Sequence, residues 1–213
     1  PLSPASVARM SDDIRVLSQD LIASVRSNGG CDFFTDISQH FPVAIFLKMA
    51  DLPFSDRHEL IAIADKITHD PTPGAHVEGI GELAAYLRPT VAARRFDPGD
   101  DLISTIASVE IDGEMPPVED IIDLVTNIVR GGLDTVVSGL AFIMGYLARN
   151  PKEYATLVNG SVSLKSAGEE LLRVFGVANL ERCAMNDMEL HGVQLKRFDR
   201  FIIIPALYNV DPD

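Results

Sequence analysis

The chain contains no tryptophan and only two cysteines among its 213 residues. Cys31 and Cys183 lie far apart and form no CxxC pair, so the sequence predicts neither a zinc site nor a disulfide framework. Positive charge is also scarce, because 18 Lys and Arg stand against 31 Asp and Glu, a formal net charge of −13. Since phosphate binding needs clustered Lys and Arg, this balance argues against a nucleic-acid partner.

Long uncharged apolar runs are missing as well. No stretch approaches 18 apolar residues without a charge, so the sequence predicts no membrane-spanning segment and no membrane partner. The first residues, Pro1-Leu2-Ser3-Pro4, lack the basic-then-apolar pattern of a signal peptide. They also lack an initiating Met, so we expect that the natural chain begins elsewhere. With no targeting pattern visible, a cytoplasmic location is the default expectation.

Helical periodicity is what the sequence has in abundance. After a short extended piece expected at Cys31–Phe34, the longest apolar helix begins at Pro116-Pro117 and runs to about Ala148. A tight hairpin turn is expected at 111–114. Near the end the apolar period changes from 3.6 to 2, as in Met188, Leu190, Val193 and Leu195. The sequence therefore predicts a mainly α fold with a small β region.

The middle of the long helix carries residues that weaken a helix interior. Gly131 and Gly132 expose the backbone, and Thr135 can turn its hydroxyl onto the carbonyl of Gly131. Asp134, if buried, would be an acid in a low-dielectric site. Two interpretations stay open: close packing against another helix, or a groove on an opened helix that holds a flat apolar ligand and passes protons to it.

A second pattern lies about 35 residues further on. Glu170 and Arg173 are three apart on a predicted helix, a spacing at which an acid and a base pair on one face. Such a pair alone is most often an exposed surface contact. Its position between the long helix and the β segment makes it informative.

Together these patterns resemble the cytochrome P-450 superfamily of haem-thiolate monooxygenases, and within it the bacterial camphor 5-monooxygenase group. The resemblance rests on four segments: DLPFSD at 51–56, GGLDTVV at 131–137, EELLR at 169–173 and HGVQLK at 191–196. It covers nearly the whole chain. It implies the central portion of the cytochrome P-450 fold, from the long central helix through the ExxR helix and the sheet that follows.

The loop that gives this superfamily its axial ligand is not in the sequence. Its pattern, FxxGxxxC, occurs nowhere, and neither Cys31 nor Cys183 has the Phe and Gly context. The resemblance thus implies that residues 1–213 form a single partial domain, an internal fragment without the N-terminal part and the C-terminal Cys loop. The metal ligand is expected outside this segment.

The resemblance also implies roles for individual residues. Thr135 would hydrogen-bond bound dioxygen, Asp134 would relay protons, and the glycines 131 and 132 would leave room for haem, oxygen and substrate. Arg182 would pair with a haem propionate. Glu170 and Arg173 would belong to a buried salt-bridge network behind the haem. The positions that match walls of the substrate pocket are Ile67, Thr68, Asn127, Arg130, Gly131 and Ala178.

The implied activity is the hydroxylation of a small apolar, terpenoid-like molecule by a b-type haem with a thiolate ligand. The implied partners are dioxygen and a [2Fe–2S] ferredoxin that donates two electrons. Three departures bear on the substrate. Arg130 replaces an apolar pocket residue, Leu180 replaces an acid near a propionate, and Phe198 replaces a turn glycine.

Two alternatives remain. The chain is either part of an ordinary enzyme, or a truncated haem-free product that acts only as a binding or non-catalytic module. A helical ligand-binding regulator is a weaker third interpretation, because no basic helix-turn-helix that would read DNA is visible.

Overall fold

The structure, a computed structural model, describes residues 4–211. The beginning of the Pro1–Pro4 stretch and the terminal residues 212 and 213 lie outside the described residues. By its internal contacts the chain divides into two compact units, Pro1–Val137 and Ser138–Asp213. Helix α7 (Val118–Arg149) begins in the first unit and ends in the second.

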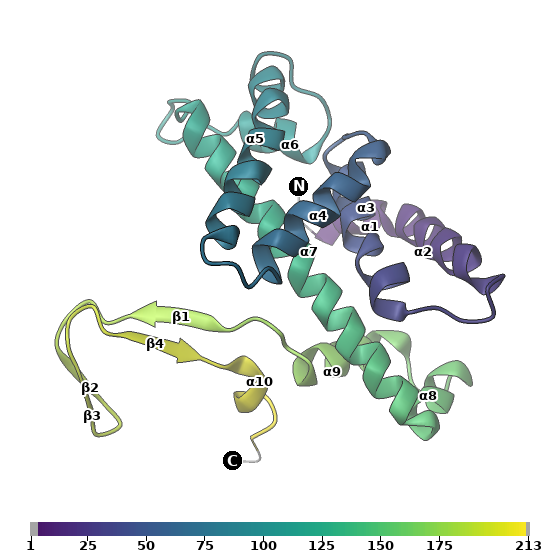
Figure 1. Cartoon of the computed structure of the whole chain (residues 1–213). Helices are drawn as coiled ribbons and strands as arrows, with labels where there is room; N and C mark the ends of the chain where they lie inside the picture. The colour runs from purple at the N-terminus through teal and green to yellow at the C-terminus, as the bar shows by residue number, and fades with distance from the viewer. Residues whose placement is uncertain (1–3, 212–213) are drawn as a thin grey trace. The chain divides into compact units, whose positions relative to one another are not determined.

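The first unit is helical through its described residues, with one isolated antiparallel bridge between Ile111 and Glu114. Its elements before α7 are α1 (Pro4–Arg9), α2 (Ser11–Arg26), the π-helix η1 (Phe34–Ser38), α3 (His40–Met49), the 3-10 helix η2 (Phe54–Asp56), α4 (Arg57–Thr68), α5 (Ala75–Phe96) and α6 (Leu102–Ala107) (Figure 1). The bridge confirms the hairpin turn expected at 111–114. Its two inner residues, Asp112 and Gly113, both have positive φ.

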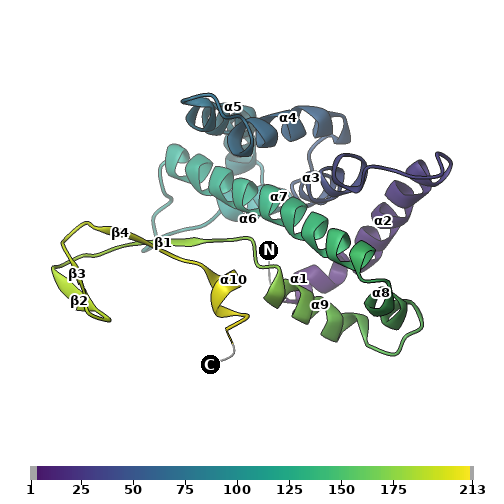
Figure 2. The same ribbon diagram turned by 60° about the horizontal axis from the view of Figure 1, so that its bottom comes forward.

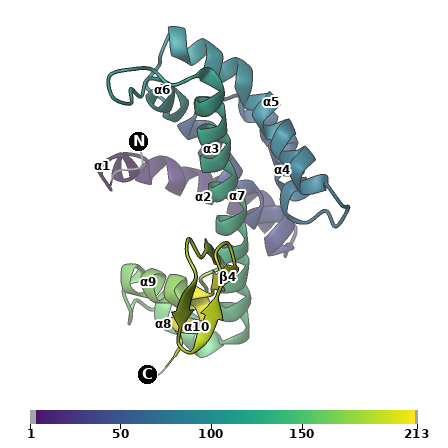
Figure 3. The ribbon, with the colours of Figure 1, turned by 90° about the vertical axis from the view of Figure 1, so that its left-hand side faces the viewer.

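The core of this unit forms where α3, α4, α5, α6 and α7 meet. The large side chains that are fully buried there include Leu47, Leu60, Leu83, Leu87, Ile103 and Ile122. Helices α4 and α5 lie side by side (Figures 1 and 3), and Gly79 makes their close approach possible. A Cβ at Gly79 would lie 2.8 Å from Cγ1 of Ile67, closer than two carbon atoms can approach. The end of α4 is therefore fixed against α5.

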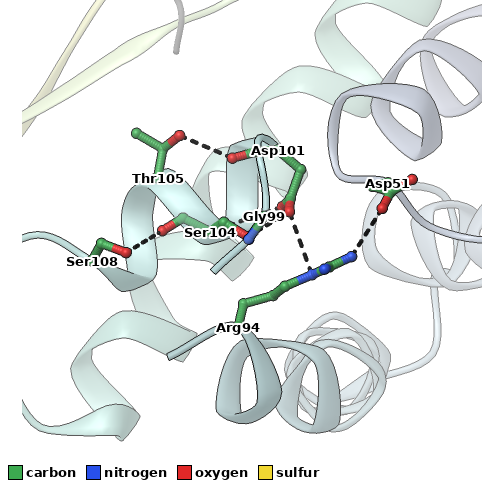
Figure 4. Close-up of polar contacts among 7 residues, drawn as sticks. All are labelled: Asp51, Arg94, Gly99, Asp101, Ser104, Thr105 and Ser108. Carbon is green, nitrogen blue, oxygen red and sulfur yellow. Dashed lines mark hydrogen bonds and ion pairs between the residues drawn. The ribbon is translucent and has the colours of Figure 1, made fainter. Parts of the chain in front are cut away.

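A buried carboxylate caps α6 and ties it to α5 (Figure 4). The Asp101 carboxylate accepts hydrogen bonds from the backbone N–H of Ser104 at 2.9 Å and from its hydroxyl at 2.5 Å. The guanidinium of Arg94 lies 3.4 Å from Asp101 and 3.0 Å from Asp51. Only 5% of the Asp101 side chain is exposed, so these contacts replace most of its hydration.

The second unit contains the end of α7, α8 (Pro151–Val158) and α9 (Leu164–Val174), which pass close together in Figure 2. Strands β1 (Leu180–Cys183) and β4 (Arg200–Ile203) pair antiparallel, as do β2 (Met188–Leu190) and β3 (Val193–Leu195), and α10 (Pro205–Tyr208) follows. His191 and Gly192, with φ of 47° and 81°, make the tight turn between β2 and β3. The mainly α fold with a small β region is confirmed, although the β region forms two separate two-stranded sheets.

Helix α7 changes one expectation. Its most apolar 18-residue window is long and hydrophobic enough to cross a membrane, although a few charges interrupt the helix. Length and composition alone are weak grounds for a membrane span, because the core helix of a soluble protein passes the same test. Ile122, Val125 and Val129 of α7 lie in the core of the first unit, each at most 2% exposed. One face of α7 therefore belongs to this core, although only 22% of the apolar window is buried among the described residues.

Candidate functional site

The glycine-containing stretch lies in the middle of α7. The hydroxyl of Thr135 donates a hydrogen bond of 2.7 Å to the carbonyl oxygen of Gly131, as the sequence predicts. The predicted opening of the helix is wrong, since α7 continues through both glycines as one uninterrupted α-helix. The physical reason is tertiary packing: the neighbouring Val129 and Leu133, 2% and 3% exposed, bind this turn to the core.

Helix α7 presents two different faces at this point. One face buries Val125, Val129 and Leu133 in the core of the first unit. On the other face, Leu124 and Gly131 are exposed and the side chain of Thr135 is partly exposed. These three residues are spaced by seven and four positions, which aligns them along one side of a helix.

The two glycines leave this side of the helix open. Among the described residues, a Cβ placed on Gly131 or on Gly132 would meet nothing within 4 Å. No helix of residues 4–211 therefore packs closely against either glycine. We call the stripe formed by Leu124, Asn127, Gly131 and Thr135 the open face of α7. The first unit therefore offers a flat strip of backbone with a hydroxyl at one end.

Asp134 lies to one side of the open face. Consecutive residues of an α-helix are about 100° apart around its axis, so Asp134 and Thr135 point in different directions. The Asp134 side chain borders a small cavity against α3 and α4, and 32% of it is exposed. The condition of burial, under which Asp134 would be an acid in a low-dielectric site, is therefore not met among the described residues. The carboxylate is partly hydrated, because it lies at the edge of the helix packing.

The predicted pocket residues of this unit differ in their surroundings. Asn127 and Arg130 are exposed on α7, where the Arg130 guanidinium donates to Oδ1 of Asn127 at 3.3 Å. Arg130 thus lies along the helix one turn back. Thr68 is exposed at the end of α4, whereas Ile67 is 8% exposed and packs in the core against Gly79.

The ExxR pair forms on α9. Two hydrogen bonds of 2.8 and 2.6 Å join the Arg173 guanidinium to the Glu170 carboxylate, and they lower the pKa of that carboxyl. Arg173 also donates to the backbone oxygen of Asn209. Among the described residues the Arg173 and Glu170 side chains are 45% and 60% exposed, so the buried network expected here stays a prediction. In the second unit these residues connect α9 to the end of α10, and no further layer covers them among the described residues.

The remaining predicted residues lie around the first sheet. Ala178 is exposed in the loop between α9 and β1, and Arg182 is exposed on β1. Among the described residues, the Arg182 guanidinium donates to the carbonyl oxygen of Glu181 at 2.9 Å, and its other N–H groups could meet an anion. Phe198 has a φ of 74°, the left-handed conformation that glycine adopts most easily. The turn geometry thus agrees with the glycine that the resemblance places there.

These residues fit a haem on one side only. The open face of α7 has space for a flat macrocycle, because among the described residues a Cβ at Gly131 would meet nothing within 4 Å. The described residues provide no axial ligand for the haem iron on the side opposite α7. Cys31 and Cys183 are exposed, and residues 4–211 contain no group of three or more His, Cys, Asp or Glu side chains able to hold a metal ion.

One neighbour of the site was missed by sequence reasoning. His69, which follows α4, lies with Nε2 4.0 Å from Oδ1 of Asp134 and with Nδ1 2.9 Å from Oδ1 of Asp65. The Asp-x-x-x-His spacing at the end of a helix is a local signal of the second contact. Nothing in the sequence signals the first contact, because residue 69 follows α4 whereas residue 134 lies on α7.

A larger cavity lies in the second unit, and one of the predicted site residues, Glu170, lines it. It has a volume of about 450 Å³, is mostly apolar, and is lined by the end of α7, α8 and α9, including Tyr146, Phe175 and Glu170. It shares no residue with the open face of α7.

Comparison with known proteins gives a consistent result. No protein-family model matches the chain. It is 29% identical to "Probable cytochrome P450 127A1" of Sinorhizobium fredii over an alignment of 194 residues. This alignment covers 91% of this chain and 46% of that protein. It is 30% identical over 206 residues to "Steroid C26-monooxygenase" of Mycobacterium tuberculosis, with 93% and 55% covered. The crystal structure of CYP101J2 superposes with a TM-score of 0.81 at 31% identity, over 94% of this chain and 50% of that one.

The chain spans about half the length of the curated relatives it matches. The structural likeness to CYP101J2 agrees with the predicted similarity to the camphor-hydroxylating group. Sequence similarity and fold agree along nearly all of the chain, and α7 carries its glycines and threonine on an open side. By these observations the chain belongs to the cytochrome P450 superfamily.

Proposed function

We propose that residues 1–213 are the central part of a single haem-thiolate monooxygenase domain in a bacterial, cytoplasmic enzyme. The observation that carries the proposal is the open face of α7, where a Cβ at Gly131 would meet nothing within 4 Å among the described residues and the Thr135 hydroxyl lies one turn away. The named monooxygenases among the relatives support the reaction class.

The residues of α7 at this face would have different roles. Gly131 and Gly132 admit a flat ligand to the backbone, because neither has a side chain to exclude it. The hydroxyl of Thr135, which now donates to the Gly131 carbonyl, is the nearest group able to donate to a ligand there. Asp134 would supply protons from the neighbouring side of the helix. The haem, when bound, supplies thiolate-assisted activation of dioxygen.

The proposed substrate is a small apolar, terpenoid-like molecule. Leu124 and Val136, which are 45% and 40% exposed, offer apolar surface on α7. Ile67, Thr68 and Asn127 remain the proposed pocket positions of the first unit, and Ala178 remains that of the second unit. Arg130 does not exclude an apolar substrate, because its guanidinium is held by Asn127 along the helix.

The second unit would bind the cofactor's charged edge and support it. Arg182 has an exposed guanidinium suited to a propionate. Glu170 and Arg173 would have a structural role, because they join α9 to the segment that ends at Asn209. We further propose a [2Fe–2S] ferredoxin as the source of the two electrons.

One observation favours a second candidate, a haem-free binding module. The described residues offer no axial ligand, since neither cysteine lies near a ligand set. Such a module would still bind an apolar molecule on the open face of α7. It would do no redox chemistry.

Spectroscopy of the whole protein that contains this chain separates the two candidates. After reduction and addition of CO, we expect the red-shifted Soret band of a thiolate-ligated haem, because the ligand is expected outside residues 1–213. The double substitution C31S/C183S should leave the band unchanged. A band of histidine ligation, no haem, or loss of the band in C183S would contradict the proposal. The 213-residue chain alone is expected to hold haem poorly.

Replacement of Thr135 by alanine tests the oxygen role. We expect the ratio of product formed to electrons consumed to fall on the order of tenfold or more, because a positioned proton donor contributes at least that much. The helix itself should tolerate the change, since alanine is the better helix former. The ratio is measured from product yield and reductant consumption in the haem-containing protein.

The matched control is T156A on α8. The hydroxyl of Thr156 also donates to a backbone carbonyl of its own helix, that of Glu153 at 2.7 Å, but lies in the second unit. T156A should leave the ratio of product to electrons unchanged. A wild-type ratio in T135A would show that this hydroxyl has no part in the reaction.

A further inference from the structure

A group of basic side chains lies where the first turns of α3 and α4 meet. His40 begins α3, and Arg57 and His58 begin α4. The imidazole rings of His40 and His58 meet edge-on with centroids 6.0 Å apart. Nη2 of Arg57 lies 3.5 Å from Nε2 of His58. We call these three residues the basic cluster, which brings two imidazoles and a guanidinium together from two helices.

The guanidinium of Arg57 is supported from one side by an aromatic ring. It lies 4.9 Å from the centroid of the Phe54 ring, a distance at which a cation is attracted to the face of the ring. Phe54 is itself 53% exposed, so its ring adds little to the core. Its contact with Arg57 restricts the guanidinium before any ligand arrives. A restricted guanidinium loses less conformational entropy on binding.

The neighbouring acids are engaged by other donors. The Asp56 carboxylate accepts hydrogen bonds from the hydroxyl of Ser55 at 3.0 Å and from the hydroxyl of Tyr86 at 2.8 Å. The Asp36 carboxylate accepts one from the backbone N–H of Asp32, at 2.9 Å. Neither carboxylate therefore forms a direct contact with the basic cluster.

Two nitrogen atoms of the basic cluster have no hydrogen-bond partner. Nδ1 of His40 and Nε of Arg57 are both buried and unpaired among residues 4–211. Within the same residues no carboxylate pairs with Arg57. Burial lowers the pKa of His40, the positive charges of Arg57 and His58 lower it further, and Asp36 opposes them less strongly. Positive charge therefore exceeds negative charge at this point.

The number and direction of the donors select the ligand. A guanidinium alone satisfies a flat carboxylate with two parallel hydrogen bonds. Two imidazoles from another direction add donors that a tetrahedral dianion, with acceptor oxygens on several sides, can use. His58 is exposed and Arg57 is half-buried, so a small ion can reach them from solvent. The arrangement fits a phosphate group better than a carboxylate.

We propose that the basic cluster binds a phosphate dianion, with Phe54 as the support of the Arg57 guanidinium. The site goes beyond the monooxygenase function, because it lies at the start of α3 and α4 and shares no residue with the open face of α7. The chain has a formal net charge of −13, which repels anions. The affinity must therefore come from the local arrangement of the basic cluster.

Inorganic phosphate titrated into the 213-residue chain with ¹⁵N-labelled histidine tests the site. Near neutral pH and at constant ionic strength, we expect saturable shifts of the ring signals of His40 and His58, which H40Q and H58Q assign. The ring signals of His191, in the β2–β3 turn, should stay. The pKa of His40 should rise when phosphate is bound, because the anion opposes the effect of Arg57. Shifts that do not saturate, or that chloride or acetate produces equally, overturn the proposal.

Phenyl phosphate identifies the source of the phosphate group. If this monoester shifts the same two histidine signals as strongly as inorganic phosphate, the site accepts the phosphate group of a larger molecule. If only inorganic phosphate shifts them, the ligand is the free ion. Either result supports a phosphate site, whereas saturable binding of neither overturns it.

Substitutions of Arg57 give the decisive comparison. R57Q should weaken phosphate binding on the order of tenfold or more, because it removes the charge and the fork of N–H donors. R57K keeps the charge without the fork and should weaken it by a smaller factor. The matched control is R26Q, a change of an exposed arginine at the end of α2, which should bind phosphate like the wild type. Wild-type affinity in R57Q overturns the proposal.

A second measurement protects the test against a folding defect. Phosphate should raise the thermal midpoint of the wild-type chain, because a ligand that binds the folded state stabilises it, and should not raise that of R57Q. If R57Q does not fold, R57K and H58Q decide, and wild-type phosphate affinity in both overturns the proposal. None of these measurements needs haem, so their outcome is independent of the proposed function.

Discussion

Replacement of Leu83 by alanine is expected to lower the free energy of unfolding by about 2–5 kcal/mol, the range for truncating a large buried aliphatic side chain. Leu83 is 0% exposed and lies in the core cluster together with Leu60 of α4 and Ile103 of α6. The loss has two parts: the transfer free energy of the deleted methyl groups, and the cavity that three surrounding helices cannot close. Urea unfolding followed by far-UV circular dichroism measures it.

The matched control for Leu83 is L172A. Leu172 lies on α9 and is 65% exposed, so the same chemical change should alter the unfolding free energy by no more than about 0.5 kcal/mol. A loss below about 1 kcal/mol in L83A would mean that α4, α5 and α6 do not meet around this side chain. The core of the first unit would then be placed wrongly.

Replacement of Asp101 by alanine should cost about 2–4 kcal/mol. The variant removes the N-cap of α6, leaves the buried Ser104 donors without an acceptor, and takes from Arg94 its buried partner. A lost cap costs about 1 kcal/mol, and each buried polar group left unpaired adds about 1–3 kcal/mol. The total loss of unfolding free energy should stay at the lower end of the sum of these values, because the structure can relax partly and Arg94 keeps Asp51 as a partner.

Two further variants separate the cap from the charge at Asp101. D101N keeps an acceptor for the Ser104 N–H but removes the negative charge, so it should cost about half as much as D101A. The neighbouring exposed Asp100 serves as the control, and D100A should stay within about 0.5 kcal/mol of the wild type. Equal unfolding midpoints for D100A and D101A would contradict the assignment of Asp101 as the cap.

The features predictable from the sequence are those set by neighbouring residues. The long helix could be bounded because Pro116-Pro117 opens it and its apolar periodicity runs to about Ala148, and the structure has α7 at Val118–Arg149. The tight turn at Asp112-Gly113 was predictable because few residues accept positive φ. The bond from Thr135 to Gly131 was readable because both partners lie one turn apart.

The wrong secondary-structure predictions lie where contacts between distant residues determine the local conformation. The sequence predicts an extended piece at Cys31–Phe34, but Phe34 begins the π-helix η1. Ser38 of η1 is fully buried and donates to the carbonyl of Val137 at 2.6 Å, a contact across 99 residues that favours the wider helix. The helix α8 was missed because Pro151, which closes α7, also begins the next helix.

The candidate site shows the same division. The residues that lie on α7 were predictable as a group, since helix geometry alone aligns Asn127, Gly131 and Thr135. The position of His69 beside Asp134 was not, because it depends on how α4 crosses α7. The pairing of Glu170 with Arg173 was predictable, because their spacing on a helix brings the two side chains together. Whether the pair is buried was not predictable, because spacing does not determine which residues cover it.

The two small sheets have a practical consequence for anyone who handles the isolated chain. Within residues 4–211 each of the four strands has an unpaired edge, and Ile202, Ile203 and Val193 are 62%, 43% and 60% exposed. Bare edges beside apolar side chains are templates for intermolecular strand addition, and a two-stranded ribbon is only marginally stable in water. Stock solutions of the chain are therefore expected to become turbid on concentration, and dilute, cold storage will preserve them longest.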